Sequence, residues 1–276
     1  HLSLRRQRQM CIRDSLKSDL SADLLKQLIQ KIEAQQPRFI VVNLHLEEIT
    51  GTTLEKKQLS QFASTIPHLV ATSDQVLQKG EQKTLALPYP LDTFPIASAP
   101  TTYDRKILAK DNVTRRMITS YQGIPLLHTT IAGTYNPSIL DLNAIRGTFE
   151  FIGSTQVYID FHPRGTYPKY SFQDILNSKA GVNFKDKIVI IGNDTELNSA
   201  DYVQTPYSRE LANMTTAEMH ANMFDTLILN SAPKRLPDWF NTVLTFVIAA
   251  FTVHIVLSMK PSKGLILIGA VLLGFA

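Results

Sequence analysis

Hydrophobic and polar residues follow different periods in successive segments of the chain. Residues 21–34 repeat apolar side chains every three or four positions, which predicts an amphipathic helix capped by Ser21 and ended by Pro37. Residues 39–44 are almost continuously apolar, which is typical of a strand buried on both faces. Residues 54–64 predict a second helix, and the short apolar segment at Leu69 predicts a second strand.

The same alternation continues through the next part of the chain. Apolar runs predict strands at residues 126–131, 157–161 and 187–191, and helices are expected at residues 170–177 and 215–230. The prolines of residues 82–101 predict a segment that wraps a surface without regular structure. Strands that alternate with helices favour an α/β fold, a layered domain with a mostly parallel sheet.

Two apolar runs follow this domain. Residues 239–259 carry no formal charge, and 21 residues of helix span roughly 30 Å, the thickness of a bilayer's hydrocarbon core. We therefore expect a transmembrane helix over residues 237–259. After a basic turn at residues 260–263, residues 264–276 are expected to begin a second transmembrane helix. His254 lies inside the first run, where it either marks function or reaches toward the interface.

The first fifteen residues suggest an origin outside the protein. Residues 10–15 back-translate as ATG TGT ATA AGA GAC AG, which resembles the transposon end used in sequencing libraries. Residues 2–4 back-translate as CTG TCT CTT, the start of the same element on the other strand. We therefore predict that residues 1–15 are a sequencing-adapter scar and exclude them from the fold.

Without that segment the composition excludes several function classes. The segment holds Arg5, Arg6, Arg8 and Arg13 against Asp14, so the remainder has 24 basic and 23 acidic residues and gives no argument for binding nucleic acid. The single cysteine, Cys11, also lies in the segment. The remainder therefore has no disulfide, no thiolate nucleophile and no cysteine-bound metal.

The polar residues after the strand at residues 187–191 form the densest group of candidates. Loops at the carboxyl ends of strands are where open α/β sheets bind ligands. A glycine at the end of the strand allows another part of the chain to approach closely. The candidate ligand-binding or structural residues of this region are Gly192, Asn193, Asp194, Asp201, Thr205, His220 and Asn222.

Two interpretations of this region stay open. Asp194, Asp201 and His220 could converge on a metal ion or an anion. Their irregular spacing favours the alternative, in which Asp201 and the Thr205 hydroxyl brace the loop while His220 hydrogen-bonds to the backbone. We therefore assign no metal and no cofactor.

Other polar residues give weaker signals. Arg115 and Arg116 could hold an anionic ligand through charge-assisted hydrogen bonds, although such a pair more often forms a solvated strand end. Asp160, His162 and Asp201 offer groups that a hydrolase would use, but no motif places a nucleophile among them. We therefore expect no enzyme in this chain.

Four segments resemble, in order, the type-two CHASE domain, a cyclase/histidine-kinase-associated sensory extracellular domain of bacteria. The resemblance covers about residues 16–236. Asn43 stands where the family usually has Asp, and Asn112 where it usually has Gly. The four segments are residues 24–46 with Pro37 and Ile40, residues 110–117 with Asp111, Arg115 and Arg116, residues 157–172, and residues 184–222 with Thr205, Pro206, His220, Ala221 and Asn222.

The resemblance implies a sensory, ligand-binding domain of a transmembrane receptor in the bacterial inner membrane. Residues 16–236 would lie in the periplasm and control a cytoplasmic class III nucleotide cyclase, histidine kinase, Ser/Thr kinase or diguanylate cyclase. An unknown ligand and a homodimer are implied. The basic residues on the two sides of the first apolar run balance, so the turn at residues 260–263 is placed in the cytoplasm on family grounds.

Two other classes remain as alternatives, a membrane-anchored scaffold and a membrane-tethered hydrolase. One departure from the family also has a structural consequence. Such domains begin with a transmembrane helix and an early strand. If residues 1–15 are a scar, we expect the sheet to lack that strand and to have an unpaired edge.

Overall fold

A computed structural model describes residues 9–14, 20–74, 86–100, 113–177, 181–194, 201–207, 214–234 and 238–258 of the protein. The chain divides into two compact units, His1–Pro233 and Lys234–Ala276. The first unit has the mixed α/β fold that the sequence predicts, with a parallel sheet at its centre.

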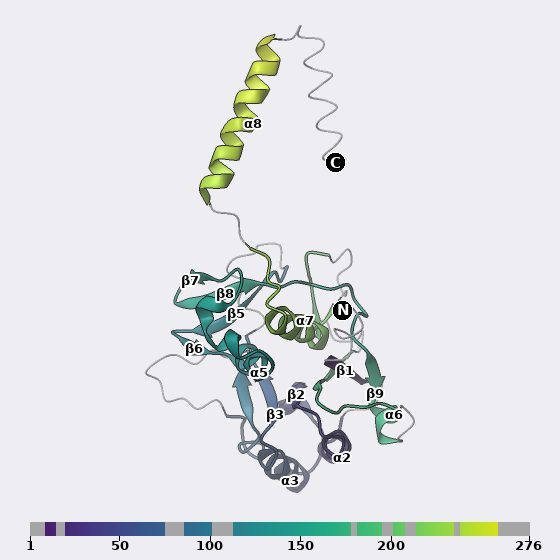
Figure 1. The fold of residues 1–276 in the computed structure, drawn as a ribbon. Helices are drawn as coiled ribbons and strands as arrows, with labels where there is room; N and C mark the ends of the chain where they lie inside the picture. The colour runs from purple at the N-terminus through teal and green to yellow at the C-terminus, as the bar shows by residue number, and fades with distance from the viewer. Residues whose placement is uncertain are drawn as a thin grey trace. The chain divides into compact units, whose positions relative to one another are not determined.

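The central sheet has six strands in the order β4-β3-β2-β10-β1-β9 (Figure 1). Each strand is parallel to its neighbours. Its strands are β1 (Gln9–Asp14), β2 (Phe39–Asn43), β3 (Leu69–Ser73), β4 (Ile96–Ser98), β9 (Lys169–Ser171) and β10 (Ile188–Asn193).

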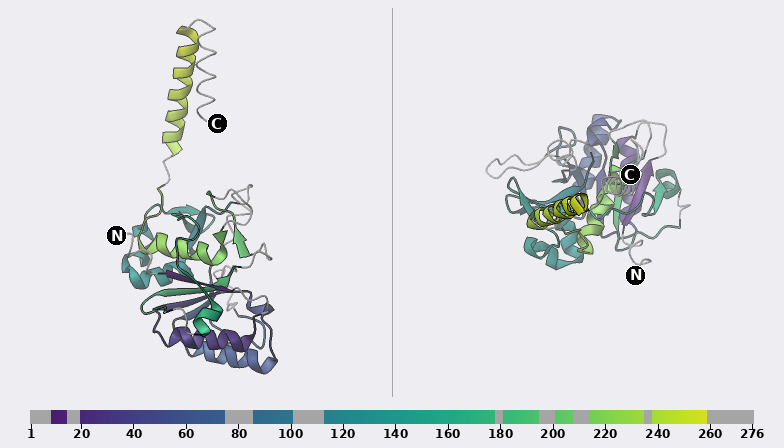
Figure 2. Two further views of the ribbon diagram at one scale, coloured as in Figure 1. Left: turned by 90° about the vertical axis from the view of Figure 1, so that its right-hand side faces the viewer. Right: turned by 90° about the horizontal axis from the view of Figure 1, so that it is seen from above.

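Helices cover both faces of this sheet. On one side lie α2 (Ala22–Glu33), α3 (Thr53–Ser64) and α6 (Phe172–Leu176), and on the other α5 (Leu127–Tyr135) and α7 (Thr216–Ile228) (Figure 2). Ile40 and Val42 in β2 belong to the core that includes α2, whereas Val41 between them belongs to the core that includes α7. This two-sided burial explains why the strand sequence is almost continuously apolar.

Local sequence signals set the helix starts. The Ser21 hydroxyl accepts a hydrogen bond from the Leu24 N–H, and Thr52 and Glu55 form a reciprocal capping box at the start of α3. The Thr215 hydroxyl accepts from the Glu218 N–H at the start of α7. The predicted helices at residues 21–34, 54–64, 170–177 and 215–230 are confirmed in α2, α3, α6 and α7.

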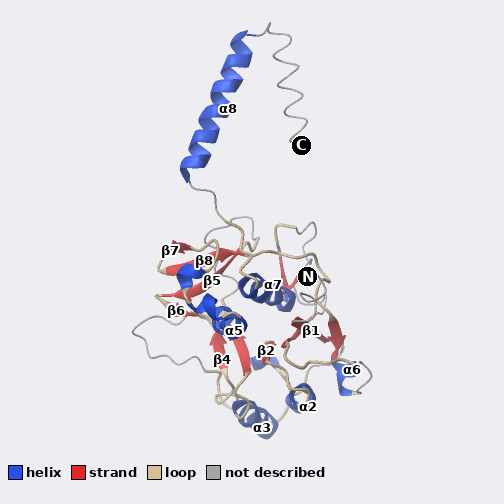
Figure 3. Cartoon of the chain, viewed as in Figure 1, coloured by secondary structure: helices blue, strands red, loops and turns tan. Residues whose placement is uncertain are grey.

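A second, antiparallel sheet has the order β6-β5-β8-β7 (Figure 3). It was not predicted, although the strand expected at residues 157–161 overlaps the end of β8. A short antiparallel pair, β11 and β12, joins the residues before α7 to the loop after β10. The strands are β5 (Arg116–Tyr121), β6 (Ile124–Pro125), β7 (Phe149–Phe151), β8 (Ser154–Tyr158), β11 (Tyr202–Val203) and β12 (Met214–Thr215), with 3₁₀ turns at Leu46–Glu48, Pro137–Leu140 and Leu142–Ala144.

The strand predicted at residues 126–131 is wrong, because this segment forms the start of helix α5. Its β-branched residues suggested a strand. In the structure the Thr130 hydroxyl donates to the Leu126 carbonyl one turn earlier, and the Thr129 hydroxyl donates to the Thr119 carbonyl in β5. The segment is therefore a helix that packs between β5 and α7.

The region predicted to lack regular structure also differs in part from the expectation. The short strand β4 (Ile96–Ser98) pairs with β3 and forms one edge of the central sheet. The remaining described residues between 86 and 100 form turns, and Tyr89–Pro90 is a cis peptide bond. Residues 82–85 and 101 lie outside the described residues.

The prediction of a missing strand is wrong for this structure. β1, formed by Gln9–Asp14, lies between β10 and β9 and pairs with both in parallel. Residues that we excluded from the fold thus form an interior strand of the sheet. A short extended segment can do this because its backbone hydrogen-bonds to β10 on one side and to β9 on the other. The adapter origin of residues 1–15 stays a prediction.

The second unit contains helix α8 (Asp238–Ser258). Large apolar side chains along it are exposed, among them Phe246, Phe251 and Leu257. Among the described residues, however, no helix qualifies by its length and apolar character as one that could cross a membrane. The predicted transmembrane helix is therefore not confirmed, and residues 259–276 lie outside the described part of the chain.

Candidate functional site at the carboxyl edge of the sheet

The carboxyl ends of three neighbouring strands are tied to the start of α7. The Asn43 amide at the end of β2 donates to the Thr216 hydroxyl over 2.8 Å and accepts from the Thr72 hydroxyl of β3 over 2.9 Å. Gly192, near the end of β10, faces Ala217. A Cβ atom at position 192 would lie 2.6 Å from the Ala217 Cβ, so the close approach predicted for this glycine is present.

A buried ion pair connects the predicted loop to α7. Lys169 Nζ lies 2.9 Å from Glu218 Oε2 and 3.8 Å from Asp194 Oδ2. The Tyr202 hydroxyl donates to Asp194 Oδ1 over 3.0 Å, and the Gly165 N–H donates to Glu218 Oε1 over 2.5 Å. Glu218 is fully buried, and Asp194 is almost fully buried. Removing only one partner would leave a buried charge without its counter-charge, which strongly lowers the free energy of unfolding.

Asp201 is the least satisfied carboxyl group of this edge. Only 5% of the residue is exposed, and its Oδ2 atom has no hydrogen-bond partner among the residues that the structure describes. Its Oδ1 lies 3.9 Å from Nε2 of the exposed His45. Burial raises the pKa of Asp201, while the charge of His45 and a hydrogen bond from Asn193 oppose the rise. Asn193 and Asp201, two of the predicted residues, are therefore in contact.

His220 is buried and contacts the α5 side chain His128. Its Nδ1 atom lies 2.7 Å from Nε2 of His128, and the two rings stack with centroids 5.0 Å apart. Burial lowers the pKa of His220 to about 4, an effect opposed by Asp74, and it lowers the pKa of His128 as well. The expectation that His220 hydrogen-bonds to the backbone is wrong, because a second imidazole occupies that position.

Asn222 forms hydrogen bonds inside the fold. Its Oδ1 accepts from the His162 N–H over 2.7 Å, and its Nδ2 donates to the Glu218 carbonyl within α7 over 2.8 Å. The His162 ring lies 3.0 Å from Asp225 Oδ2 in the next turn of α7. Asn222 therefore holds the segment after β8 against α7, away from solvent.

The remaining predicted residues are Thr205, Arg115 and Arg116. The Thr205 hydroxyl accepts a long hydrogen bond from the Tyr207 N–H, 3.4 Å, which fits a role within its loop. Arg115 donates to the Val113 carbonyl over 3.5 Å. Arg116, in β5, lies over three aromatic rings of the antiparallel sheet, those of Phe149, Phe151 and Tyr158.

Within the residues that the structure describes, no three His, Cys, Asp or Glu side chains are grouped closely enough to hold a metal ion. Asp194, Asp201 and His220 do not converge, since His220 pairs with His128. Among the described residues, the carboxyl edge instead brings together the buried carboxyl groups of Asp194, Asp201 and Glu218 with the ammonium group of Lys169.

Four contributors to these contacts were not identified from the sequence. Glu218 stands three residues after Thr215, a spacing that indicates only a helix cap. His128 is 92 residues from its partner, and no motif connects them. His45 and Lys169 each follow or begin a strand of the sheet. The position of His45, two residues after β2, was a signal of this kind, whereas Lys169 begins β9 at its amino end, where the rule for carboxyl ends gives no signal.

Comparison with known families agrees with the architecture. The model of the CHASE2 domain family matches residues 5–259. Searches of curated proteins and of solved structures gave no match. The chain therefore belongs to the CHASE2 family, whose members are extracellular sensory domains of membrane receptors rather than enzymes.

Proposed function

We propose that this CHASE2 domain is the periplasmic sensor of a receptor in the bacterial inner membrane and that it controls a cytoplasmic output domain. The output domain would be a class III nucleotide cyclase, a histidine kinase, a Ser/Thr kinase or a diguanylate cyclase. Membership of a family of extracellular sensory domains supports the sensory role. Because such output modules usually work in pairs, we also propose that the receptor is a homodimer.

The ligand of this sensor binds at the carboxyl edge of the central sheet. The observation that carries this proposal is Asp201, a buried carboxyl group next to the exposed imidazole of His45. Its Oδ2 has no hydrogen-bond partner within the described part of the chain. A buried polar atom without a partner costs free energy that a bound donor would recover. Among the described residues, Asp194 and Glu218 share the ammonium group of Lys169, so the negative charge of this edge favours a ligand with a basic group.

The carboxyl edge contacts α7 directly. Asn43 and Lys169, which belong to the central sheet, contact Thr216 and Glu218 in the first turn of α7. α7 is also the last helix before α8 along the chain. A ligand that binds one arrangement of these contacts more tightly than another would shift the population of α7 positions by that difference in affinity.

Residues 237–259 form the membrane anchor in this proposal. The uncharged run of residues 239–259 and the exposed apolar side chains of α8, such as Phe246 and Phe251, support it. Expression in bacteria followed by alkaline carbonate washing of the membranes tests the anchor. The chain should stay with the membranes, whereas a chain that ends at residue 233 should be released. Release of both would contradict the anchor.

The ligand site is tested by thermal unfolding of the full chain with small primary amines and with their N-acetylated counterparts. An amine that binds should raise the midpoint of unfolding, its neutral counterpart should not, and Asp201→Asn should abolish the rise. Asp92→Asn, at an exposed position, should preserve it. Equal shifts in the wild type and in Asp201→Asn would refute this site.

The receptor role is tested separately by reading the parent genome beyond both ends of this sequence. A cyclase or kinase domain after further membrane spans is the expected result and would identify the output. A stop codon soon after position 276, without an output domain, would refute the receptor role and favour a membrane-anchored scaffold.

A further inference from the structure

The antiparallel sheet has two hairpin turns that lie side by side. Gln122 and Gly123 connect β5 to β6, and Ile152 and Gly153 connect β7 to β8. The Gln122 N–H donates to the Gly153 carbonyl over 2.8 Å, which joins the two turns. Together with Ile124, the residue after the first turn, these four residues are called the hairpin tip.

Ile152 is an unusual residue for its place in the turn. Its φ angle is 46° and that of Gly153 is 68°, so both residues have left-handed backbone conformations. Two-residue turns of this kind favour Asn, Asp and Gly, whereas a β-branched residue at a positive φ is a true outlier. The domain therefore bears strain at Ile152 that a turn-forming residue would avoid, and strain of this kind is concentrated at functional sites.

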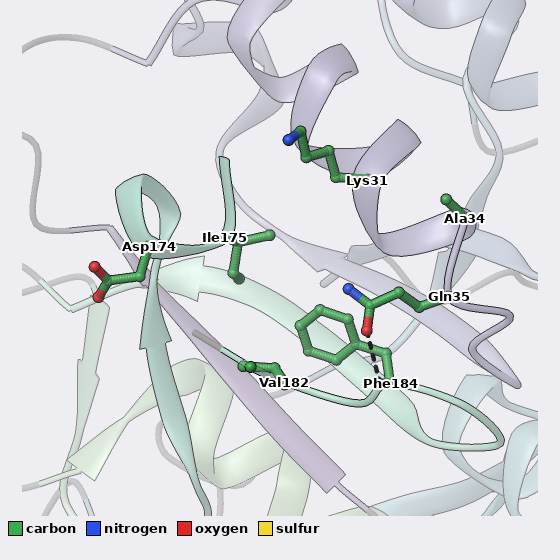
Figure 4. A pocket seen from close by; sticks show the side chains of 8 residues that line it. Lys31, Ala34, Gln35, Asp174, Ile175, Val182 and Phe184 are labelled. Atoms are coloured by element: carbon green, nitrogen blue, oxygen red, sulfur yellow. Dashed lines mark hydrogen bonds between the residues drawn. The ribbon is translucent and has the colours of Figure 1, made fainter. Parts of the chain in front are cut away.

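Ile152 is also exposed. Its exposed fraction is 64%, and that of Ile124 on the adjoining turn is 46%. The cavity of about 490 Å³ beside α2 is different, because the apolar residues Ile175 and Phe184 in its lining belong to the buried core (Figure 4). One exposed apolar side chain is ordinary, but here two share a tip and one of them is strained. An apolar partner at the tip would remove both isoleucines from water.

The segment that leads into β7 is bound to the end of the first unit. The Asn230 side chain accepts a hydrogen bond from the Arg146 N–H over 2.7 Å and donates one to the Ala144 carbonyl over 3.0 Å. A Cβ atom on Gly147 would lie 2.6 Å from the carbonyl oxygen of Pro233. The chain therefore leaves the first unit in direct contact with the residues before β7.

This contact is close in the chain both to the hairpin tip and to α8. Ile152 is five residues after Gly147, and α8 begins at Asp238, five residues after Pro233. Five residues span at most about 17 Å. Figure 1 shows β7 and β8 at the end of the first unit from which the chain leaves, and α3 at the opposite end.

Two basic side chains flank the same contact. Arg146 precedes Gly147, Lys234 follows Pro233, and both are exposed. Neither forms an ion pair with a residue that the structure describes. Arginine and lysine next to exposed apolar residues are typical of protein surfaces that lie on phospholipid, where the cations contact phosphate groups.

We infer that the hairpin tip binds the surface of a phospholipid bilayer. Ile124 and Ile152 enter the boundary between headgroups and acyl chains, while Arg146 and Lys234 contact the lipid phosphates. The inference rests on the proposed membrane anchor, which brings a bilayer within a few residues of Pro233. It adds a second attachment of the chain to the membrane.

The test uses the full chain in vesicles of phosphatidylcholine and phosphatidylglycerol whose acyl chains carry bromine, which quenches tryptophan fluorescence. Trp239 is replaced by Phe in every variant, so that one introduced tryptophan gives the signal. Bromine should quench Ile152→Trp and Ile124→Trp but should leave Leu54→Trp unquenched. Leu54 is the matched control because it is also 64% exposed and lies in the first turn of α3. Equal quenching of Ile152→Trp and Leu54→Trp would overturn the inference.

A second comparison tests the two cations. Arg146→Gln with Lys234→Gln, added to Ile152→Trp, should weaken the contact about fivefold for each charge removed, measured from the quenched fraction. Lys57→Gln with Lys185→Gln removes two exposed lysines elsewhere and should leave the quenching unchanged. Equal quenching in the two double variants would overturn the role of the cations.

The alkaline carbonate wash keeps this inference apart from the anchor on which it rests. Release of the full chain from the membranes would contradict the anchor. A chain that stays with the membranes while both tip tryptophans remain unquenched would overturn the hairpin contact and leave the anchor in place.

Discussion

His128 and His220 stack against each other in the interior of the domain, with Nε2 of the first 2.7 Å from Nδ1 of the second. One ring comes from α5, which lies between β6 and β7 of the antiparallel sheet in the chain, and the other from α7, which packs on the parallel sheet. A neutral imidazole has one donor and one acceptor nitrogen, so the pair can form its hydrogen bond only while at least one acceptor nitrogen stays unprotonated. The contact between α5 and α7 therefore depends on the protonation state of the two histidines.

This pair predicts a loss of stability in acid. The folded-state pKa of His220 is lowered to about 4 by burial, against 6.5 for an ordinary histidine, and that of His128 is lowered too. The unfolded chain therefore binds more protons below pH 6.5, and the stabilisation is complete above that pH and is lost as the pH falls toward 4. For His220 alone the loss at pH 4.5 is on the order of 2 kcal/mol.

Urea unfolding at pH 7.5 and pH 4.5 measures this dependence. The double variant His128→Leu, His220→Leu should lose less free energy of unfolding between the two values than the wild type, because neither position can then titrate. An identical loss in the wild type and in the double variant would mean that other groups cause the acid sensitivity. Asp74, whose charge acts on His220, is kept in all variants.

Gly192 predicts a second, steric effect. In Gly192→Ala the new Cβ would meet the Ala217 Cβ at 2.6 Å, well below any normal contact, so β10 and α7 must separate. The expected cost is about 1–3 kcal/mol in the free energy of unfolding, measured by urea denaturation. The double variant Gly192→Ala, Ala217→Gly removes the clash and should recover part of the loss. A fully stable single variant would contradict the close packing.

The sequence indicated the central sheet better than its surroundings. The helix that begins at Ser21 and the strand at Phe39–Asn43 carry clear periodicities because each is buried along a defined face. The segment of α5 was predicted as a strand, although Thr129 and Thr130 lie in a helix. The hydrogen bond from the Thr129 hydroxyl to the Thr119 carbonyl and the packing of the helix between β5 and α7 favour that helix. The periodicity of buried residues can be recognised within one segment, whereas the packing of α5 involves other segments of the chain.

The residues of the candidate site that lie in one segment were predicted, whereas those that come from other segments were not. Asn193, Asp194 and Asp201 follow a buried strand, so the rule for carboxyl ends identified them. Their partners Lys169 and Glu218 come from other elements, and only the folded sheet brings them together. His220 was assigned to the wrong neighbours, since its partner in α5 belongs to a segment that was expected to be a strand.

The Lys169–Glu218 pair predicts an asymmetry between single and double substitutions. Lys169→Met leaves Glu218, which is fully buried, without its cation and should cost about 3–5 kcal/mol in the free energy of unfolding. The double variant Lys169→Met, Glu218→Gln removes both charges and should be more stable than the single one. Chemical denaturation of the two variants, with Lys185→Met as an exposed control, tests this. A single variant as stable as the wild type would show that the pair is not buried in solution.

The last prediction concerns β1, the strand formed by residues that resemble a library adapter. Because β1 lies between β10 and β9, a proline there removes a backbone N–H from the interior of the sheet. Ile12→Pro should therefore lower the free energy of unfolding by about 3 kcal/mol or more. Thr53→Pro is the matched control, since it places proline at the first position of α3, where its ring is tolerated. Urea denaturation of both variants decides the matter. Equal stability of Ile12→Pro and the wild type would mean that residues 9–14 do not pair in solution, and it would restore the expectation of an open edge beside β10.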